Sequence, residues 1–189
     1  MKRLFSLLTI LFICLTTFGQ LPKTIEFGYL GHFSYQPGMK LGLQFDLKSW
    51  EKELKKKSDT RSTVFFVRPS IGTFSRINYN LNLSTGIDGG LELNKASKSF
   101  FHKYSLGLNY LMHSELNSIT VNLEGKVINK DRENRHYILP LITYGFGKNY
   151  SNGLGWYTNL SGGLKISTNY ENIGMLFTEI GMSYQLKNK

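Results

Sequence analysis

Apolar and polar residues alternate with a period of two along most of this chain. The clearest run covers residues 39–48, where apolar side chains alternate with glycine and with polar or charged side chains. Such alternation predicts β-strands with one apolar and one polar face. Beyond residue 22 no segment shows a sustained helical period. The pattern therefore predicts an all-β protein.

Nine strand-like runs can be distinguished, separated by segments rich in Gly, Asn, Ser, Pro or charge. They cover approximately residues 25–29, 39–47, 63–71, 79–93, 104–110, 119–127, 137–147, 156–166 and 173–186. We expect loops at Ser114–Asn117 and Asn129–Arg135, and register faults near Pro140 and Thr178–Glu179. Most runs approach the roughly ten residues that a tilted strand needs to cross a bilayer.

The first twenty residues have a different character. A basic start, Met1-Lys2-Arg3, precedes an apolar run from Leu4 to Phe18, which is shorter than the roughly twenty residues of a membrane-spanning helix. This arrangement is typical of a secretory signal peptide. We expect residues 1–19 to be a cleaved signal peptide and residues 20–189 to form one β-barrel domain. An uncleaved N-terminal anchor is the alternative.

Cysteine usage and charge narrow the possible chemistry. The single cysteine, Cys14, lies inside the predicted signal peptide, so we expect no disulfide, thiol catalysis or cysteine-bound metal in the mature chain. The histidines show no metal-ligand spacing either, and we expect no metal and no cofactor. The net charge of +10 raises the question of nucleic acid. A cluster of lysines in one segment favours a solvated surface loop instead, and no nucleic-acid partner: Lys52, Lys55, Lys56 and Lys57.

The polar face of the predicted strands is rich in Gly, Asn and Ser and carries charges of both signs. These charges are Glu26, Lys40, Asp46, Asp88, Glu92, Glu124, Lys126 and Lys165. Such a face is typical of the lumen of a membrane barrel, whose other face contacts lipid. In the run 39–48 this predicts Leu41, Leu43 and Phe45 toward lipid, and Gly42, Gln44 and Asp46 toward the lumen. A soluble barrel also alternates, so a secreted ligand carrier remains an alternative.

Aromatic residues support a membrane location. The chain has 13 Phe and 11 Tyr, and many lie near the ends of runs, where an interfacial girdle is expected. Examples are Phe33, Tyr35, Tyr79, Phe100, Phe101, Tyr104, Tyr137 and Tyr150. Because lipid cannot satisfy free strand edges, the sheet must close. We therefore predict an antiparallel up-and-down closed transmembrane β-barrel of 8–10 strands, and one of the nine runs must be miscounted, since bacterial barrels have even numbers.

With its terminal segment Gly181–Leu186, the chain resembles small outer-membrane β-barrel proteins of the OmpA and OmpX type, and Gln36–Gly42 resembles uncharacterised small outer-membrane barrels. The resemblance implies the outer membrane, contact with its lipid including lipopolysaccharide, insertion by the barrel-assembly machinery, and a monomer. It implies no activity. Lys187-Asn188-Lys189 departs from the usual aromatic ending. If the C-terminus is periplasmic and one N-terminal strand is unread, the lysine loop would lie on the cell surface.

A narrow barrel is filled by its own side chains, so a structural or surface-binding role is expected rather than a wide pore. The alternative is a lipid A-modifying hydrolase. His32 and Ser34 lie two residues apart on one strand face, as a base and a nucleophile would. They resemble the His-x-Ser pair of the lipid A deacylase barrels. Both share the parity of Glu26, however, which predicts that they face the lumen rather than lipid.

Overall fold

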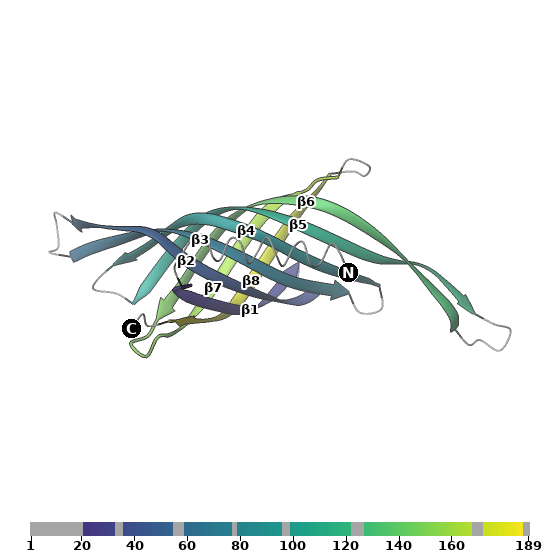
Figure 1. The fold of residues 1–189 in the computed structure, drawn as a ribbon, viewed down its shortest axis with the longest axis horizontal. Helices are drawn as coiled ribbons and strands as arrows, with labels where there is room; N and C mark the ends of the chain where they lie inside the picture. Colours follow the sequence, from purple (N-terminus) through teal and green to yellow (C-terminus); the bar gives the residue numbers. More distant parts are fainter. Residues whose placement is uncertain are drawn as a thin grey trace.

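The computed structural model describes residues 21–32, 36–54, 59–76, 79–95, 99–121, 127–167 and 172–186. Eight antiparallel strands follow one another around a closed barrel, and β1 pairs with β8 to complete the ring (Figure 1). The strands are β1 (Thr24–His32), β2 (Gln36–Leu54), β3 (Asp59–Arg76), β4 (Asn80–Lys95), β5 (Phe100–Val121), β6 (Val127–Asn149), β7 (Leu154–Lys165) and β8 (Ile173–Gln185). The predicted all-β up-and-down barrel is confirmed, with eight strands.

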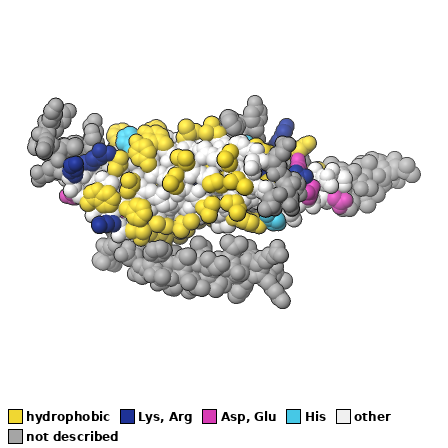
Figure 2. Space-filling view, turned by 90° about the horizontal axis from the view of Figure 1, so that it is seen from above, with side chains coloured by type: hydrophobic (Ala, Val, Ile, Leu, Met, Phe, Trp, Pro, Cys, Tyr) yellow, Lys and Arg dark blue, Asp and Glu magenta, His cyan; other side chains and the backbone are white. Residues whose placement is uncertain are grey.

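The alternation in the sequence places apolar side chains outside the barrel and polar ones inside. Leu106 and Ile142 pair directly across β5 and β6, and their side chains are 67% and 69% exposed on the outer surface. Figure 2 shows apolar side chains spread over the middle of the visible face, with charged ones toward the ends. Among the described residues, no helix is long and apolar enough to span a membrane.

The strand count differs from the nine predicted runs because of one long hairpin. Ser114–Asn117 and Asn129–Arg135, expected to be loops, belong to β5 and β6. β4 pairs with β5 only as far as Glu115, and the β6–β7 contacts end at the Ile138–Ile166 bridge, so the hairpin projects beyond its neighbours. Strand segments that project into water can be polar on both faces, which in sequence looks like a turn. The described ends of the predicted run 119–127 thus belong to β5 and β6, and residues 122–126 lie outside the described residues.

Two predicted register faults are absent, and register shifts occur elsewhere, in the β2–β3 pair and toward the end of the β5–β6 hairpin. β8 pairs with β1 and β7 without a shift at Thr178–Glu179, and Pro140 stays in register opposite Leu108. The parity in β8 was misread because the inward-facing Phe177 is apolar. A bulge lies instead between Asp46 and Lys48. Just before it, Phe45 pairs with Val67 between the inward-facing Gln44 and Asp46, so it belongs to the outward face as predicted, although its side chain is only 3% exposed.

The aromatic girdle is partly as predicted. Tyr79, Phe100, Tyr104 and Tyr150 are exposed on the outside, but Phe101 and Tyr137 are buried inside the barrel. Adjacent residues of a strand face opposite sides, so Phe100 and Phe101 cannot both lie outside. Phe33 and Tyr35 lie outside the described residues.

The two ends of the barrel differ. Thr24 and Gln185 pair at one end, here called the terminal end, and the other is the distal end. The β2–β3 hairpin extends from the terminal end and the β5–β6 hairpin from the distal end (Figure 1). Lys52, predicted to lie in a loop, belongs instead to strand β2 and is exposed at the terminal end, and Lys55, Lys56 and Lys57 fall outside the described residues. The expectation that the lysine loop lies opposite the C-terminus is wrong, because β1 pairs directly with β8 and no strand is missing between them.

Candidate functional site

The barrel interior contains a cluster of ionisable side chains, here called the central charge network. Its three cations and four carboxylates come from β1, β2, β3, β4, β5 and β8 and are nearly excluded from solvent. They are Lys40, Arg68, Lys103, Glu26, Asp88, Glu92 and Glu179. Because a charge buried without a partner is very costly, the network is stable only as a set.

Arg68 lies at the centre of the network and is 2% exposed. Its Nη1 donates a hydrogen bond to Glu26 Oε2 at 2.6 Å, and its Nε and Nη2 both donate to Asp88 Oδ2, at 3.1 and 2.8 Å. The planar guanidinium can serve two carboxylates on different strands at once. A Cβ on Gly42 would lie 3.3 Å from Arg68 Cδ, so glycine leaves room for the arginine.

Lys103 extends the network across the lumen. Its Nζ donates hydrogen bonds to Glu26 Oε1 and to Gln44 Oε1, the latter at 2.6 Å, and lies 3.2 Å from Glu92 Oε2. The same ammonium lies 4.9 Å from the ring centroid of Phe101. Glu26 thus joins both buried cations, Arg68 and Lys103.

A third part of the network involves Glu179. Its carboxylate accepts hydrogen bonds from Tyr157 Oη at 2.8 Å and from Asn159 Nδ2 at 3.1 Å, and it lies 3.3 Å from Lys40 Nζ. The Tyr157 ring fits because glycines face it: a Cβ on Gly181 would lie 2.7 Å from Tyr157 Cζ. The glycines on the polar face therefore make space for large polar side chains.

Toward the distal end, the interior changes from charged to apolar. A layer of buried side chains from β1, β3, β5, β6 and β8 packs together there. It consists of Leu30, Phe74, Leu111, Tyr137, Leu139, Leu141 and Phe177, with Met175 against it. A water-filled passage would have to cross both this apolar layer and the central charge network.

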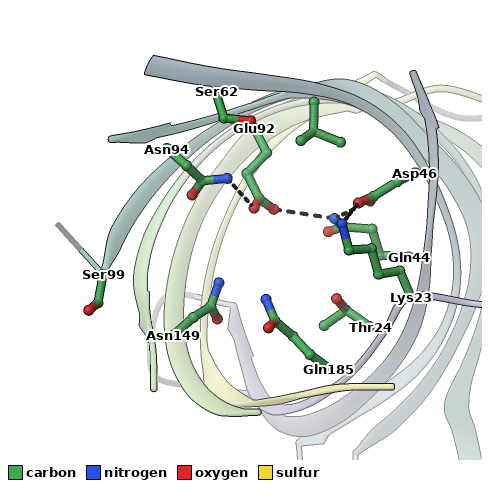
Figure 3. Close-up of a pocket in the computed structure, with 11 residues that line it drawn as sticks. Lys23, Thr24, Gln44, Asp46, Ser62, Glu92, Asn94, Ser99, Asn149 and Gln185 are labelled. Atoms are coloured by element: carbon green, nitrogen blue, oxygen red, sulfur yellow. Dashed lines mark hydrogen bonds and ion pairs between the residues drawn. The ribbon is translucent and has the colours of Figure 1, made fainter. Parts of the chain in front are cut away.

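A polar cavity of about 250 Å³ opens at the terminal end (Figure 3). Amide, hydroxyl and carboxylate side chains line it, including Asn94, Asn149 and Gln185. At its rim, Lys23 and Asp46 form an ion pair with 2.8 Å between Nζ and Oδ2. Glu92 lines this cavity and also belongs to the central charge network. Its Oε2 accepts a hydrogen bond from Gln44 Nε2 at 3.2 Å.

A second polar group lies on the distal side of the apolar layer. His113 Nδ1 lies 2.6 Å from Asn82 Oδ1, and Arg135 forms ion pairs with Glu115 at 3.4 Å and Glu133 at 2.8 Å. Lys165 places its Nζ 3.9 Å from the ring centroid of Tyr137. No cluster of three or more His, Cys, Asp or Glu side chains suited to a metal ion occurs in the part of the chain that the structure describes.

The structure places six of the eight predicted lumen charges inside the barrel. Glu26, Lys40, Asp88 and Glu92 belong to the central charge network, and Asp46 lines the cavity at the terminal end. Lys165 lies beyond the apolar layer and is buried. Glu124 and Lys126 fall outside the described residues.

Sequence reasoning missed three members of the network, Arg68, Lys103 and Glu179. Parity gave a signal for Lys103, which continues the polar series of Ser105, Gly107 and Asn109 on β5. Arg68 follows two inward apolar residues, Val64 and Phe66, and Glu179 follows the inward Phe177. Because apolar and charged residues share the inward face of these strands, the alternation of apolar and polar positions is not visible there in the sequence.

Of the candidate catalytic pair, only His32 lies within the described residues. His32 lies at the distal end of β1 with the inward parity of Glu26, and its ring centroid is 5.3 Å from that of the buried Phe177. Ser34 lies outside the described residues. The histidine thus faces the barrel interior, as its parity predicted.

This closed ring, apolar outside and polar inside, is the fold of small outer-membrane β-barrel proteins. The crystal structure of the outer membrane enzyme PagL is similar, with a TM-score of 0.54 and 14% sequence identity over 86% of this chain and 99% of that chain. CarO2 of Acinetobacter baumannii has a TM-score of 0.26 and 8% identity over 88% of this chain and 100% of its own. No family model and no curated protein matches the chain. At this identity, the similarity to PagL shows the fold alone.

Proposed function

We propose that this protein is an integral outer-membrane β-barrel with an occluded interior, which acts as a structural or surface-binding protein rather than as a pore. In this proposal residues 1–19 are a cleaved signal peptide, the barrel-assembly machinery inserts the chain, and the mature barrel is a monomer in contact with outer-membrane lipid. The outward apolar side chains, exemplified by Leu106 and Ile142, support contact with lipid.

The occluded interior is the observation that carries the proposal. Arg68 and Lys103 bridge carboxylates from β1 and β4 across the lumen, and Phe74, Leu111 and Phe177 pack in the layer beyond them. An eight-stranded barrel has an interior just wide enough to be filled by side chains. With the interior filled, surface binding would involve the hairpins and loops at the ends of the barrel.

The proposal predicts that liposomes containing the purified protein are no more permeable to small sugars than protein-free liposomes. A large porin, reconstituted at the same protein-to-lipid ratio, provides the positive control for the swelling assay. Sugar-dependent swelling at the porin's rate would show an open lumen and contradict the occluded barrel.

A secreted soluble carrier, the second alternative, fits the structure poorly. A soluble barrel buries its apolar face and leaves its polar face in water. Here large apolar side chains such as Leu106, Ile142 and Ile180 are exposed outside, while Arg68 and Glu26 are buried inside. An apolar outer surface of this kind favours a lipid environment.

The hydrolase alternative predicts a different result for cellular lipid A. Because His32 faces the interior and packs against Phe177, we expect that His32→Ala and Ser34→Ala leave lipid A acylation unchanged. Mass spectrometry of lipid A from cells that express each form, with an empty-vector control, tests this. A loss of acyl chains with the wild type that either substitution abolishes would establish the enzyme instead.

A further inference from the structure

In the β2–β3 hairpin at the terminal end, the described basic and acidic side chains belong to opposite faces of the sheet. Beyond the bulge in β2, Lys48 pairs with Phe65 and Lys52 pairs with Arg61. Phe65 is exposed on the outside, so Lys48, Lys52 and Arg61 all belong to the outward face. Glu51 pairs with Ser62, which lines the interior cavity together with Asp46 and Glu92. Among the described side chains of this hairpin, the basic groups thus point outward and the acidic groups belong to the inward face.

The apolar exterior of the barrel continues directly into the outward-facing cations Lys48, Lys52 and Arg61. Trp50, 43% exposed, lies between Lys48 and Lys52 and pairs with Thr63, which in turn pairs with Leu93. Lys48 is next to Phe65, whose β4 partner is the exposed Leu91. Within the described part of the chain, Lys48, Lys52 and Arg61 form no ion pair with a carboxylate.

The same combination recurs at the terminal end on β6. Lys148 pairs with Phe100 on one side and with Trp156 on the other. Its Nζ lies 5.3 Å from the ring centroid of Phe100 and 5.2 Å from that of Tyr150, and both rings are exposed on the outside. Long basic side chains beside aromatic rings are typical of a membrane interface, where the stem contacts apolar groups and the charge reaches phosphate.

We propose that this outward basic row, made of Lys48, Lys52, Arg61 and Lys148, binds the phosphates of anionic phospholipid headgroups around the terminal end of the barrel. The inference rests on the proposed membrane location and adds a preference for one class of lipid. The argument is charge complementarity: the exposed cations adjoin the apolar outer surface, and the described acidic side chains of the hairpin, Asp46 and Glu51, belong to the inward face. Each basic residue near an anionic membrane surface contributes about 1 kcal/mol, or about five-fold in binding.

Fluorescence quenching of Trp50 tests the proposal at the site. A Trp156→Phe form leaves Trp50 as the single tryptophan. The purified protein is reconstituted into phosphatidylcholine vesicles that contain an equal small fraction of either phosphatidylglycerol or phosphatidylcholine, brominated close to the headgroup. We expect brominated phosphatidylglycerol to quench Trp50 more strongly, through several-fold higher local occupancy. High salt should reduce this difference, because it screens exposed charges.

Substitutions then assign the preference to the basic row. In the Trp156→Phe background, Lys48→Gln with Lys52→Gln should markedly reduce the difference between the two brominated lipids, because two of the four cations are removed. The matched control, Arg76→Gln with Arg132→Gln, removes two exposed cations at the distal end and should retain it.

The other outcomes separate this inference from the proposed function. Equal quenching by the two lipids in the unsubstituted row would overturn the headgroup preference while supporting membrane insertion. Quenching by neither lipid would contradict the membrane location itself. An equal loss of preference in the distal control would show a general effect of net charge and overturn the assignment to this row.

Discussion

Replacement of Arg68 by methionine is expected to destabilise the barrel by about 3–5 kcal/mol, the usual effect of breaking a buried ion pair from one side. Methionine keeps much of the side-chain volume but leaves Glu26 and Asp88 without the guanidinium that bonds to both. The free energy of unfolding, measured from urea transitions in lipid vesicles, checks this.

Two controls give the Arg68 experiment its meaning. Lys23→Met breaks an ion pair with Asp46 in which the lysine is 54% exposed, and should cost at most about 1 kcal/mol. Adding Glu26→Gln and Asp88→Asn to Arg68→Met removes the uncompensated charges and should recover part of the stability. If Arg68→Met were as mild as Lys23→Met, the network would not hold the barrel together.

Leu106→Arg is expected to impair insertion and folding of the barrel in a membrane. Leu106 lies opposite Ile142 on the outward face, so in the proposed membrane location arginine there would contact hydrocarbon and cost about 2–4 kcal/mol. Folding yield into vesicles and the urea transition of the folded fraction provide the measurements.

The matched control for Leu106→Arg is Leu154→Arg, at the first residue of β7 on the same outer surface. Close to the membrane interface the cost falls to about 0–1 kcal/mol. Equal tolerance of both substitutions in a protein that stays soluble without detergent would contradict a lipid-facing surface.

The prediction of a closed barrel depended on local information. Alternation with a period of two fixes which side chains share a face, whatever the neighbouring strand is, because successive residues of any strand point in opposite directions. This is why Glu26, Asp88 and Glu92 could be assigned to the interior before any pairing was known. It also explains why Phe101 was misplaced: a position near a strand end does not reveal its face.

Strand number required tertiary information. The mostly polar segment Ser114–Asn117 has the composition of a turn, yet it continues β5 because β6 supplies backbone partners for it. Where a hairpin projects beyond its neighbours, water contacts both faces and the alternation that identifies a strand is lost. The bulge at Asp46–Lys48 likewise follows from pairing with β3 rather than from the residues of β2.

The sequence by itself determined the fold class, the apolar exterior and the inward orientation of most interior charges. All three follow from residue type and from parity along a single strand. Only the tertiary structure decided which charges are partners. Glu26, Arg68 and Lys103 come from three different strands, and their contacts depend on the register of those strands around the ring. Long-range electrostatic pairing leaves no periodic trace in the sequence, since each side chain satisfies its own strand's pattern alone.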